Sequence, residues 1–173
     1  FRALVQELAL GDGLAEIQSQ GIHTEAIITP GGTGSLYMSA RNLLEPGEAL
    51  LLRDYHWGPY NTIANECGVT TATWPLTGKD SQIDEGALRS ILSQLLIDQN
   101  RILSWLNDPA HNPTGMTLNA ESRMQVLSIF ADTAANNPNK GVTLFLDGAY
   151  AAYSREHHGW GDTIRDFTRE CIW

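Results

Sequence analysis

Two stretches decide the fold and the site: residues 108–115 read DPAHNPTG, and residues 144–150 read LFLDGAY. The first is a polar turn with two prolines and a glycine, and only Asn107 separates it from the mainly apolar run RILSWL at 101–106. The second is an apolar run that ends in Asp147, with Tyr150 three residues later. Continuous apolar runs of this length are typical of strands buried on both faces of a parallel sheet. Both stretches therefore predict a buried strand with polar side chains at its carboxyl end.

Outward from these stretches, predicted strands and helices alternate along the chain. The helices are predicted from apolar residues spaced three and four positions apart. Their ends are indicated by Gly68, which ends one helix, and by Asp84 and Asn119, which are expected N-caps. The predicted strands are residues 24–29, 49–53, 70–74, 101–106 and 142–146. The expected apolar helix positions are Leu36, Ala40, Leu43 and Leu44, then Leu88, Ile91, Leu92 and Leu95, then Leu127, Phe130, Ala131 and Ala134. This alternation predicts an α/β fold with a mostly parallel sheet and helices on both faces, a three-layer αβα arrangement.

Composition excludes several classes of function. The 173 residues are 42% hydrophobic and 18% charged, which is typical of roughly one soluble globular domain. A net charge of −9 with only 11 Lys and Arg argues against a nucleic-acid partner, because phosphate neutralisation needs basic clusters. No apolar run approaches the ~18 residues of a membrane span. Cys67 and Cys171 make neither a disulfide framework nor a zinc site, and Cys67 is expected to be a small core residue. The cytoplasm is the expected compartment.

A glycine-rich turn lies between the predicted strand at 24–29 and the next helix. Gly31, Gly32 and Gly34 would let the backbone approach a ligand closely, and free amides at a helix amino terminus bind anions. The hydroxyl of Thr33 adds a donor, so the turn suits a phosphate. Its spacing matches neither a dinucleotide fingerprint nor a Walker loop. An ordinary strand-to-helix turn would explain the same residues.

Polar and aromatic residues follow the other predicted strands. Asn112 is a pre-positioned amide donor, and a cis peptide is expected before Pro113. The carboxylate of Asp147, at the end of a buried strand, should face a cation or strong donors, and beside a pyridine nitrogen it would hold that ring protonated. Tyr150 could lie over the same site, and Trp57 could stack on a flat heterocycle. Taken singly, these residues also fit a proline turn, a helix cap or core packing. Together they suit a phosphorylated pyridine cofactor.

Four segments in one order resemble the class I aminotransferases, specifically the aspartate and aromatic amino acid group: residues 1–13, 29–36 (TPGGTGSL), 110–115 (AHNPTG) and 144–153 (LFLDGAYAAY). The resemblance implies pyridoxal 5′-phosphate, a fold type I large domain and a homodimer with active sites at the subunit interface. It implies transfer of the amino group of a dicarboxylic or aromatic L-amino acid to a 2-oxo acid. The chain opens within a helical pattern and closes without a turn signal. Residues 1–173 are therefore expected to be the central part of the large domain, with the amino-terminal arm, lysine-bearing segment and small domain outside this chain.

The resemblance also assigns roles residue by residue. Gly31, Gly32 and Thr33 would hold the cofactor phosphate. Trp57 would stack on the ring and lie close to the substrate. The strand that enters the glycine turn would not neighbour the strand that ends in Asp147.

The remaining roles fall at the other strand ends. Asn112 would donate to the ring hydroxyl oxygen and lie near the substrate carboxylate. Asp147 would pair with the pyridinium nitrogen, and Tyr150 would donate to the same ring oxygen as Asn112. Trp57, Asp147 and Tyr150 are the expected catalytic residues of this chain.

The chain departs from the family pattern at several points. The Schiff-base lysine of the family follows the aspartate strand, whereas Lys79 and Lys140 both precede Asp147, so neither is expected to serve. Histidines that support the aspartate in many members fall at Tyr60 and Asn107, which leaves the tuning of Asp147 open. A lyase or decarboxylase using the same cofactor, a domain without catalysis, and a phosphate-binding module without cofactor are the alternatives.

Overall fold

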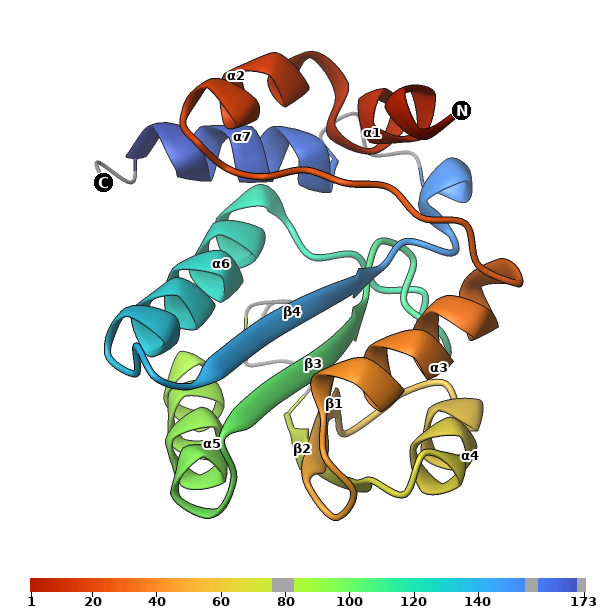
Figure 1. Ribbon diagram of the computed structural model, residues 1–173, viewed down its shortest axis with the longest axis vertical. Helices are drawn as coiled ribbons and strands as arrows, with labels where there is room; N and C mark the ends of the chain where they lie inside the picture. Colours follow the sequence, from red (N-terminus) through yellow and green to blue (C-terminus); the bar gives the residue numbers. More distant parts are fainter. Residues whose placement is uncertain (76–82, 155–158, 171–173) are drawn as a thin grey trace.

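The computed structural model describes residues 1–75, 83–154 and 159–170. These residues contain a four-stranded parallel sheet in the order β2-β1-β3-β4 (Figure 1). The strands are β1 (Ala49–Arg53), β2 (Thr70–Trp74), β3 (Arg101–Asn107) and β4 (Gly141–Asp147). Four of the predicted strands are thereby confirmed.

Helices cover both faces of the sheet, as predicted (Figure 1). Leu50, Leu52, Leu103 and Trp105 pack toward α3 (Gly31–Leu43) and α4 (Pro59–Glu66). Leu51, Ile102 and Leu106 pack toward α5 (Glu85–Asp98) and α6 (Ala120–Ala135) on the other face. Because successive strand residues point to opposite faces, the continuous apolar runs fill both cores at once. Further out lie α1 (Arg2–Leu10), η1 (Gly11–Gly13), α2 (Leu14–Ser19) and α7 (Trp160–Glu170), with η3 (Ala151–Tyr153) after β4.

The predicted helix starts are confirmed by their caps. The side chain of Asp84 accepts a hydrogen bond from the Ala87 N–H at 2.8 Å, and that of Asn119 accepts one from the Ser122 N–H at 2.8 Å. The apolar face of α6 differs from the expected one, however. Its buried apolar residues are Val126, Ile129 and Phe130, whereas Leu127, Ala131 and Ala134 are half-buried. Phe130 is buried as expected, and α6 packs against α7 as well as against α5 and β4.

The prediction of a strand over residues 24–29 is wrong. This segment carries no ladder hydrogen bonds, and Ile27 and Ile28 are 64% and 73% exposed. It crosses the molecule as extended chain between α2 and α3 (Figure 1). A β-prone sequence becomes a strand only when another strand pairs with it, and within the described residues β4 pairs with β3 alone.

The sheet brings the polar strand ends together at one edge. Asn107 of β3 is the direct register partner of Asp147 of β4. The glycine turn that begins α3 lies on the same side as these carboxyl ends (Figure 1). Cys67 is buried in the core, as expected. None of the helices in the described part of the chain is long and apolar enough to cross a membrane.

Candidate active site

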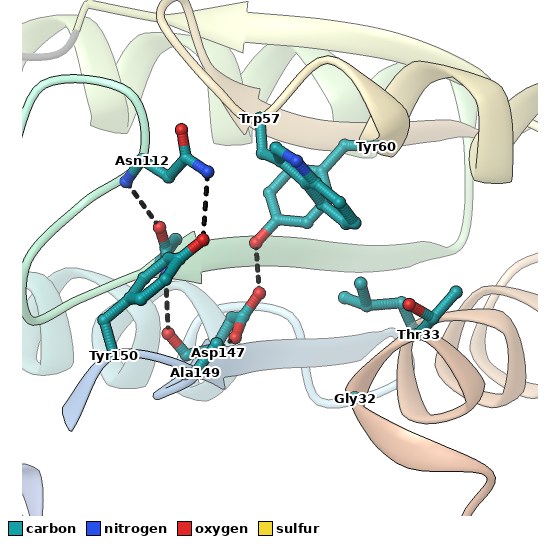
Figure 2. A pocket seen from close by; sticks show the side chains of 10 residues that line it. Gly32, Thr33, Trp57, Tyr60, Asn112, Asp147, Ala149 and Tyr150 are labelled. Carbon is teal, nitrogen blue, oxygen red and sulfur yellow. Dashed lines mark hydrogen bonds between the residues drawn. The ribbon is translucent and has the colours of Figure 1, made fainter. Parts of the chain in front are cut away.

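A cavity of about 230 Å³ opens at the carboxyl edge of the sheet (Figure 2). It gathers side chains and backbone from α3, α4 and its preceding loop, and the ends of β3 and β4. Its lining residues are Gly32, Thr33, Leu36, Trp57, Tyr60, Asn107, Asn112, Asp147, Ala149 and Tyr150. Six of the seven residues predicted for the site line this one cavity, and the seventh, Gly31, is adjacent in the chain to Gly32.

The amino terminus of α3 faces open space. Gly31 has a positive φ of 69°, a conformation that favours glycine, and its N–H donates to the carbonyl of Thr29 at 2.7 Å. Pro30 provides no side-chain cap, in contrast to Asp84 at the start of α5. A Cβ added at Gly31 or Gly32 would meet no atom within 4 Å. The first turn of this helix therefore presents backbone amides to a space that an anion could enter.

Asn112 and Tyr150 contact each other across the cavity. The amide nitrogen of Asn112 donates to the Tyr150 hydroxyl oxygen at 3.0 Å (Figure 2). Because that oxygen accepts from Asn112, the Tyr150 proton can be donated to a further acceptor. The Asn112–Pro113 peptide is cis, as predicted, and the Asp108–Pro109 peptide is cis as well, which was not predicted.

Asp147 accepts two hydrogen bonds at the end of β4. This strand was predicted to be buried, but it is half-buried, because within the described residues it pairs with β3 alone. Its Oδ2 accepts from the Tyr60 hydroxyl at 2.5 Å (Figure 2). Its Oδ1 accepts from the Ala149 N–H at 3.0 Å. The side-chain amide of Asn107 donates to the backbone carbonyl of Asp147 at 2.8 Å. Sequence reasoning left the contribution of Tyr60 and Asn107 open, and both residues contact Asp147 directly.

Trp57 lines the cavity beside Tyr60. The two rings meet edge to face, with centroids 5.7 Å apart and an interplanar angle of 86°. The indole is half-buried, so part of its surface is available to a flat ligand.

The lysines do not contribute to the cavity in the described part of the chain. The ammonium group of Lys140 donates to the backbone carbonyls of Leu96 and Gln99, at the carboxyl end of α5. It precedes β4 and therefore lies at the opposite edge of the sheet from Asp147. Lys79 lies outside the described residues. Among these residues no cluster of three or more potential metal ligands occurs.

His111 supports the loop that carries Asn112. Its Nδ1 is 2.8 Å from the Thr114 hydroxyl, and its backbone N–H donates to the Met116 carbonyl at 2.8 Å. Burial, together with the nearby charge of Arg53, lowers the pKa of His111 to about 4. The imidazole is therefore neutral at neutral pH. It stabilises the loop through its hydrogen bonds and does not supply a positive charge to the site.

The resemblance pointed to Tyr60 and Asn107 only as positions that support the aspartate in related proteins, and neither was included among the predicted site residues. Asn107 had a usable signal, because it is the last residue of β3 and ligand sites form at the carboxyl ends of parallel strands. Tyr60 had a weaker one: it follows Trp57 by three residues in the first turn of α4. Its contact with Asp147 spans 87 residues of sequence and depends on how α4 packs.

The fold and this cavity define an α/β domain in which an uncapped helix amino terminus and a carboxylate line the same cavity. The chain matches the family model described as aminotransferase class I and II over residues 8–172, and it belongs to that family. Among curated relatives, it is 31% identical over 108 residues to the probable N-succinyldiaminopimelate aminotransferase DapC of Mycobacterium tuberculosis, covering 61% of this chain and 26% of the relative. It is 32% identical over 102 residues to an aspartate aminotransferase of Musicola paradisiaca, covering 58% and 24%.

Solved structures agree with this assignment. An aminotransferase of Anaerococcus prevotii shares 32% identity at a TM-score of 0.72, over 83% of this chain and 34% of that one. An aromatic amino acid aminotransferase of Burkholderia cenocepacia, at 22% identity and a TM-score of 0.71, shares the fold over 98% of this chain and 40% of its own. The chain spans about a quarter of the length of the two curated relatives named above.

Proposed function

We propose that residues 1–173 form the central part of the cofactor-binding large domain of a pyridoxal-phosphate-dependent aminotransferase. One observation carries the proposal: a single cavity joins the uncapped amino terminus of α3 to Asp147, Tyr150, Asn112 and Trp57. An anion site, a carboxylate, a phenol, an amide and an indole are the groups that a phosphorylated hydroxypyridine needs. The membership of the chain in the aminotransferase family supports the same reaction class.

The residues present fit this cofactor. Gly31 and Gly32 leave open space beside the first amides of α3, and the Thr33 hydroxyl is exposed at the same turn. These groups would bind the phosphate through backbone N–H and hydroxyl donors, favoured by the helix dipole. A side chain at Gly32 would take up part of that space.

The other cavity residues would orient the ring and set its charge. When bound, the cofactor supplies an electron sink that stabilises a carbanion at the substrate α-carbon. Asp147 would accept a hydrogen bond from the protonated ring nitrogen. Its negative charge would keep that nitrogen protonated. Tyr150 would donate its proton to the ring oxygen, since its own oxygen accepts from Asn112. Trp57 would cover one ring face and exclude water.

The proposed substrates are a dicarboxylic or aromatic L-amino acid and a 2-oxo acid. The aspartate aminotransferase of Musicola paradisiaca, at 32% identity, favours the dicarboxylic class. We expect the full-length protein to act as a cytoplasmic homodimer, with its Schiff-base lysine outside residues 1–173. That lysine would act as general base in the amino transfer.

Two measurements on the full-length protein test the proposal. The intact mass, before and after borohydride reduction, should show a reduced pyridoxyl-phosphate adduct. Amino transfer should then be measured for aspartate, glutamate, phenylalanine and tyrosine against 2-oxo acids. Release of pyruvate, ammonia or carbon dioxide without amino transfer would indicate a lyase or decarboxylase instead. The absence of any adduct would refute the proposed function.

A further inference from the structure

Asp108 is a fully buried carboxylate between the end of β3, α6 and α7. It accepts three hydrogen bonds: the Leu118 N–H donates to Oδ1 at 2.7 Å, and Arg123 Nε and Trp160 Nε1 both donate to Oδ2 at 2.9 Å. The Arg123 guanidinium also lies over the Trp160 ring, 5.5 Å from its centroid. Burial raises the pKa of Asp108, and the three donors act against that rise. Each donor, the indole N–H included, therefore stabilises the buried charge.

The hydrogen bond from the Leu118 N–H closes a loop over residues 108–118, which we call the Asn112 loop. A second hydrogen bond crosses this loop, from the Ala110 N–H to the Thr117 hydroxyl oxygen at 2.9 Å. Asn112 lies inside the closed loop. Its position in the cofactor cavity therefore follows from how the base of the loop is held.

The carboxylate that closes the loop also holds the chain that follows Tyr150. Trp160 is the first residue of α7, which comes after Tyr150 in the sequence. One hydrogen bond, from Asn112 to Tyr150 at 3.0 Å, joins the two segments inside the cofactor cavity. Another, from Trp160 to Asp108, joins them behind it, where both residues line a different cavity between α1, α7 and the end of β4. The two segments are thus tied together at two separate points.

From this arrangement we infer that the Trp160–Asp108 hydrogen bond is a positioning contact for the cofactor site. It holds the Asn112 loop against the chain that follows Tyr150, and so sets how well Asn112 and Tyr150 donate to the ring oxygen of the cofactor. The inference rests on the proposed function. It gives the packing of α7, which lies outside the cofactor cavity, a role in the chemistry of the cofactor.

Other contacts hold α7 in place, so this one can be removed by itself. The helix lies against α1 and α2 (Figure 1). Gly161 is so close to α1 that an added Cβ would lie 2.7 Å from the Ala9 carbonyl oxygen. Arg169 donates to the two carboxylate oxygens of Glu16 in α2 at 2.5 and 2.6 Å. Loss of the Trp160 N–H alone should therefore leave α7 docked.

The test uses the full-length protein with pyridoxal phosphate bound. Replacement of Trp160 by β-(3-benzothienyl)alanine keeps the shape of the indole and puts sulfur in place of the N–H. The same replacement at Trp74 is the matched control, because Trp74 is 2% exposed and its indole N–H has no hydrogen-bond partner among the described residues. The readouts are kcat, the cofactor Kd and the pH midpoint of the absorbance change of the bound cofactor.

Weaker donation to the ring oxygen leaves more negative charge there, and this charge holds the proton of the nearby Schiff-base nitrogen more firmly. We expect the Trp160 replacement to raise the midpoint by at least about 0.5 pH unit and to lower kcat roughly 3- to 10-fold, the size of one net hydrogen bond. The cofactor Kd should change less than about threefold, because the phosphate site at α3 is untouched. The Trp74 replacement should leave the midpoint unchanged.

A double variant separates this role from a general loss of packing. When Asn112→Ala is already present, the Trp160 replacement should raise the midpoint much less, because the contact acts through the Asn112 loop. Equal shifts with and without Asn112→Ala would overturn the inference.

An unchanged midpoint in the Trp160 replacement would overturn the inference, and so would an equal shift in the Trp74 control. Trp160→Phe removes the same N–H, keeps a ring beside Arg123 and gives a second reading of the midpoint. Failure of both Trp160 proteins to fold, with the Trp74 control folded, would assign the contact to stability alone and overturn the inference too. A wild-type protein that binds no pyridoxal phosphate would refute the proposed function as well, whereas an unchanged midpoint in a working enzyme would refute the inference alone.

Discussion

Replacement of Asn107 by alanine should weaken both the fold and the cofactor site. Asn107 is 3% exposed and contacts two site residues at once. Its Oδ1 accepts from the backbone N–H of Asn112 at 2.7 Å, and its Nδ2 donates to the backbone carbonyl of Asp147 at 2.8 Å. One side chain thus fixes the distance between the amide donor and the carboxylate.

The expected loss follows from the partners that remain. The Asp147 carbonyl keeps a second donor, the Asp108 N–H at 3.2 Å, so this bond contributes only about 1 kcal/mol net. The Asn112 N–H has no other acceptor in the described contacts, so leaving it unpaired costs about 1–3 kcal/mol. Asn107→Ala should therefore lower the free energy of unfolding by about 3 kcal/mol.

The assay is urea unfolding of the cofactor-free full-length protein, followed by titration with pyridoxal phosphate. Asn65→Ala is the control, because Asn65 is exposed in α4 and alanine is the stronger helix former; it should change stability by less than about 0.5 kcal/mol. Equal stability and equal cofactor affinity in the Asn107→Ala and Asn65→Ala proteins would refute the assignment of Asn107.

Three further predictions concern the surroundings of the site. Gly32→Val should raise the cofactor Kd at least roughly tenfold in an equilibrium titration, because its side chain enters the space beside the α3 amides; an unchanged Kd would place the phosphate elsewhere. Because the pKa of His111 falls from 6.5 to about 4 on folding, its contribution is complete above pH 6.5 and decreases by on the order of 3 kcal/mol as pH falls toward 4. Unfolding measured across this range should show a weaker pH dependence in His111→Gln, and identical curves would contradict the assignment. Arg123→Met should cost about 3–5 kcal/mol in chemical denaturation, since it leaves the fully buried Asp108 carboxylate without its 2.9 Å ion-pair partner, and a loss below 1 kcal/mol would show that this pair is solvated.

The sequence predicted the layered fold because the signals it uses are local. Continuous apolar strands, the Asp84 and Asn119 caps and the glycine turn each depend on a few neighbouring residues, and the structure confirms them. The prediction of a strand over residues 24–29 failed because a strand needs a neighbouring strand to pair with, and the local sequence does not determine that pairing. The short run TEAIIT, which would suit a strand, is found here in an unpaired segment.

The site residues that directly follow predicted strands could be predicted from the sequence. Asp147, Asn112 and Tyr150 follow strands whose carboxyl ends share one edge, and they do meet in one cavity. Tyr60 was not predictable in this way. The resemblance placed Tyr60 at a position that supports the aspartate in related proteins, but it did not predict that a phenol there would contact Asp147. That contact depends on the packing of the Tyr60 ring on Trp105.

The measurement that tests the account most directly compares Asp147→Ala with the wild-type full-length protein in kcat and in cofactor Kd. Phosphate binding at α3 does not involve Asp147, so the Kd should change less than about tenfold. The ring nitrogen loses its partner, so kcat for amino transfer should fall roughly a hundred- to a thousandfold. Undiminished turnover in Asp147→Ala would contradict the role of this carboxylate and, with it, the assignment of the cavity as the cofactor site.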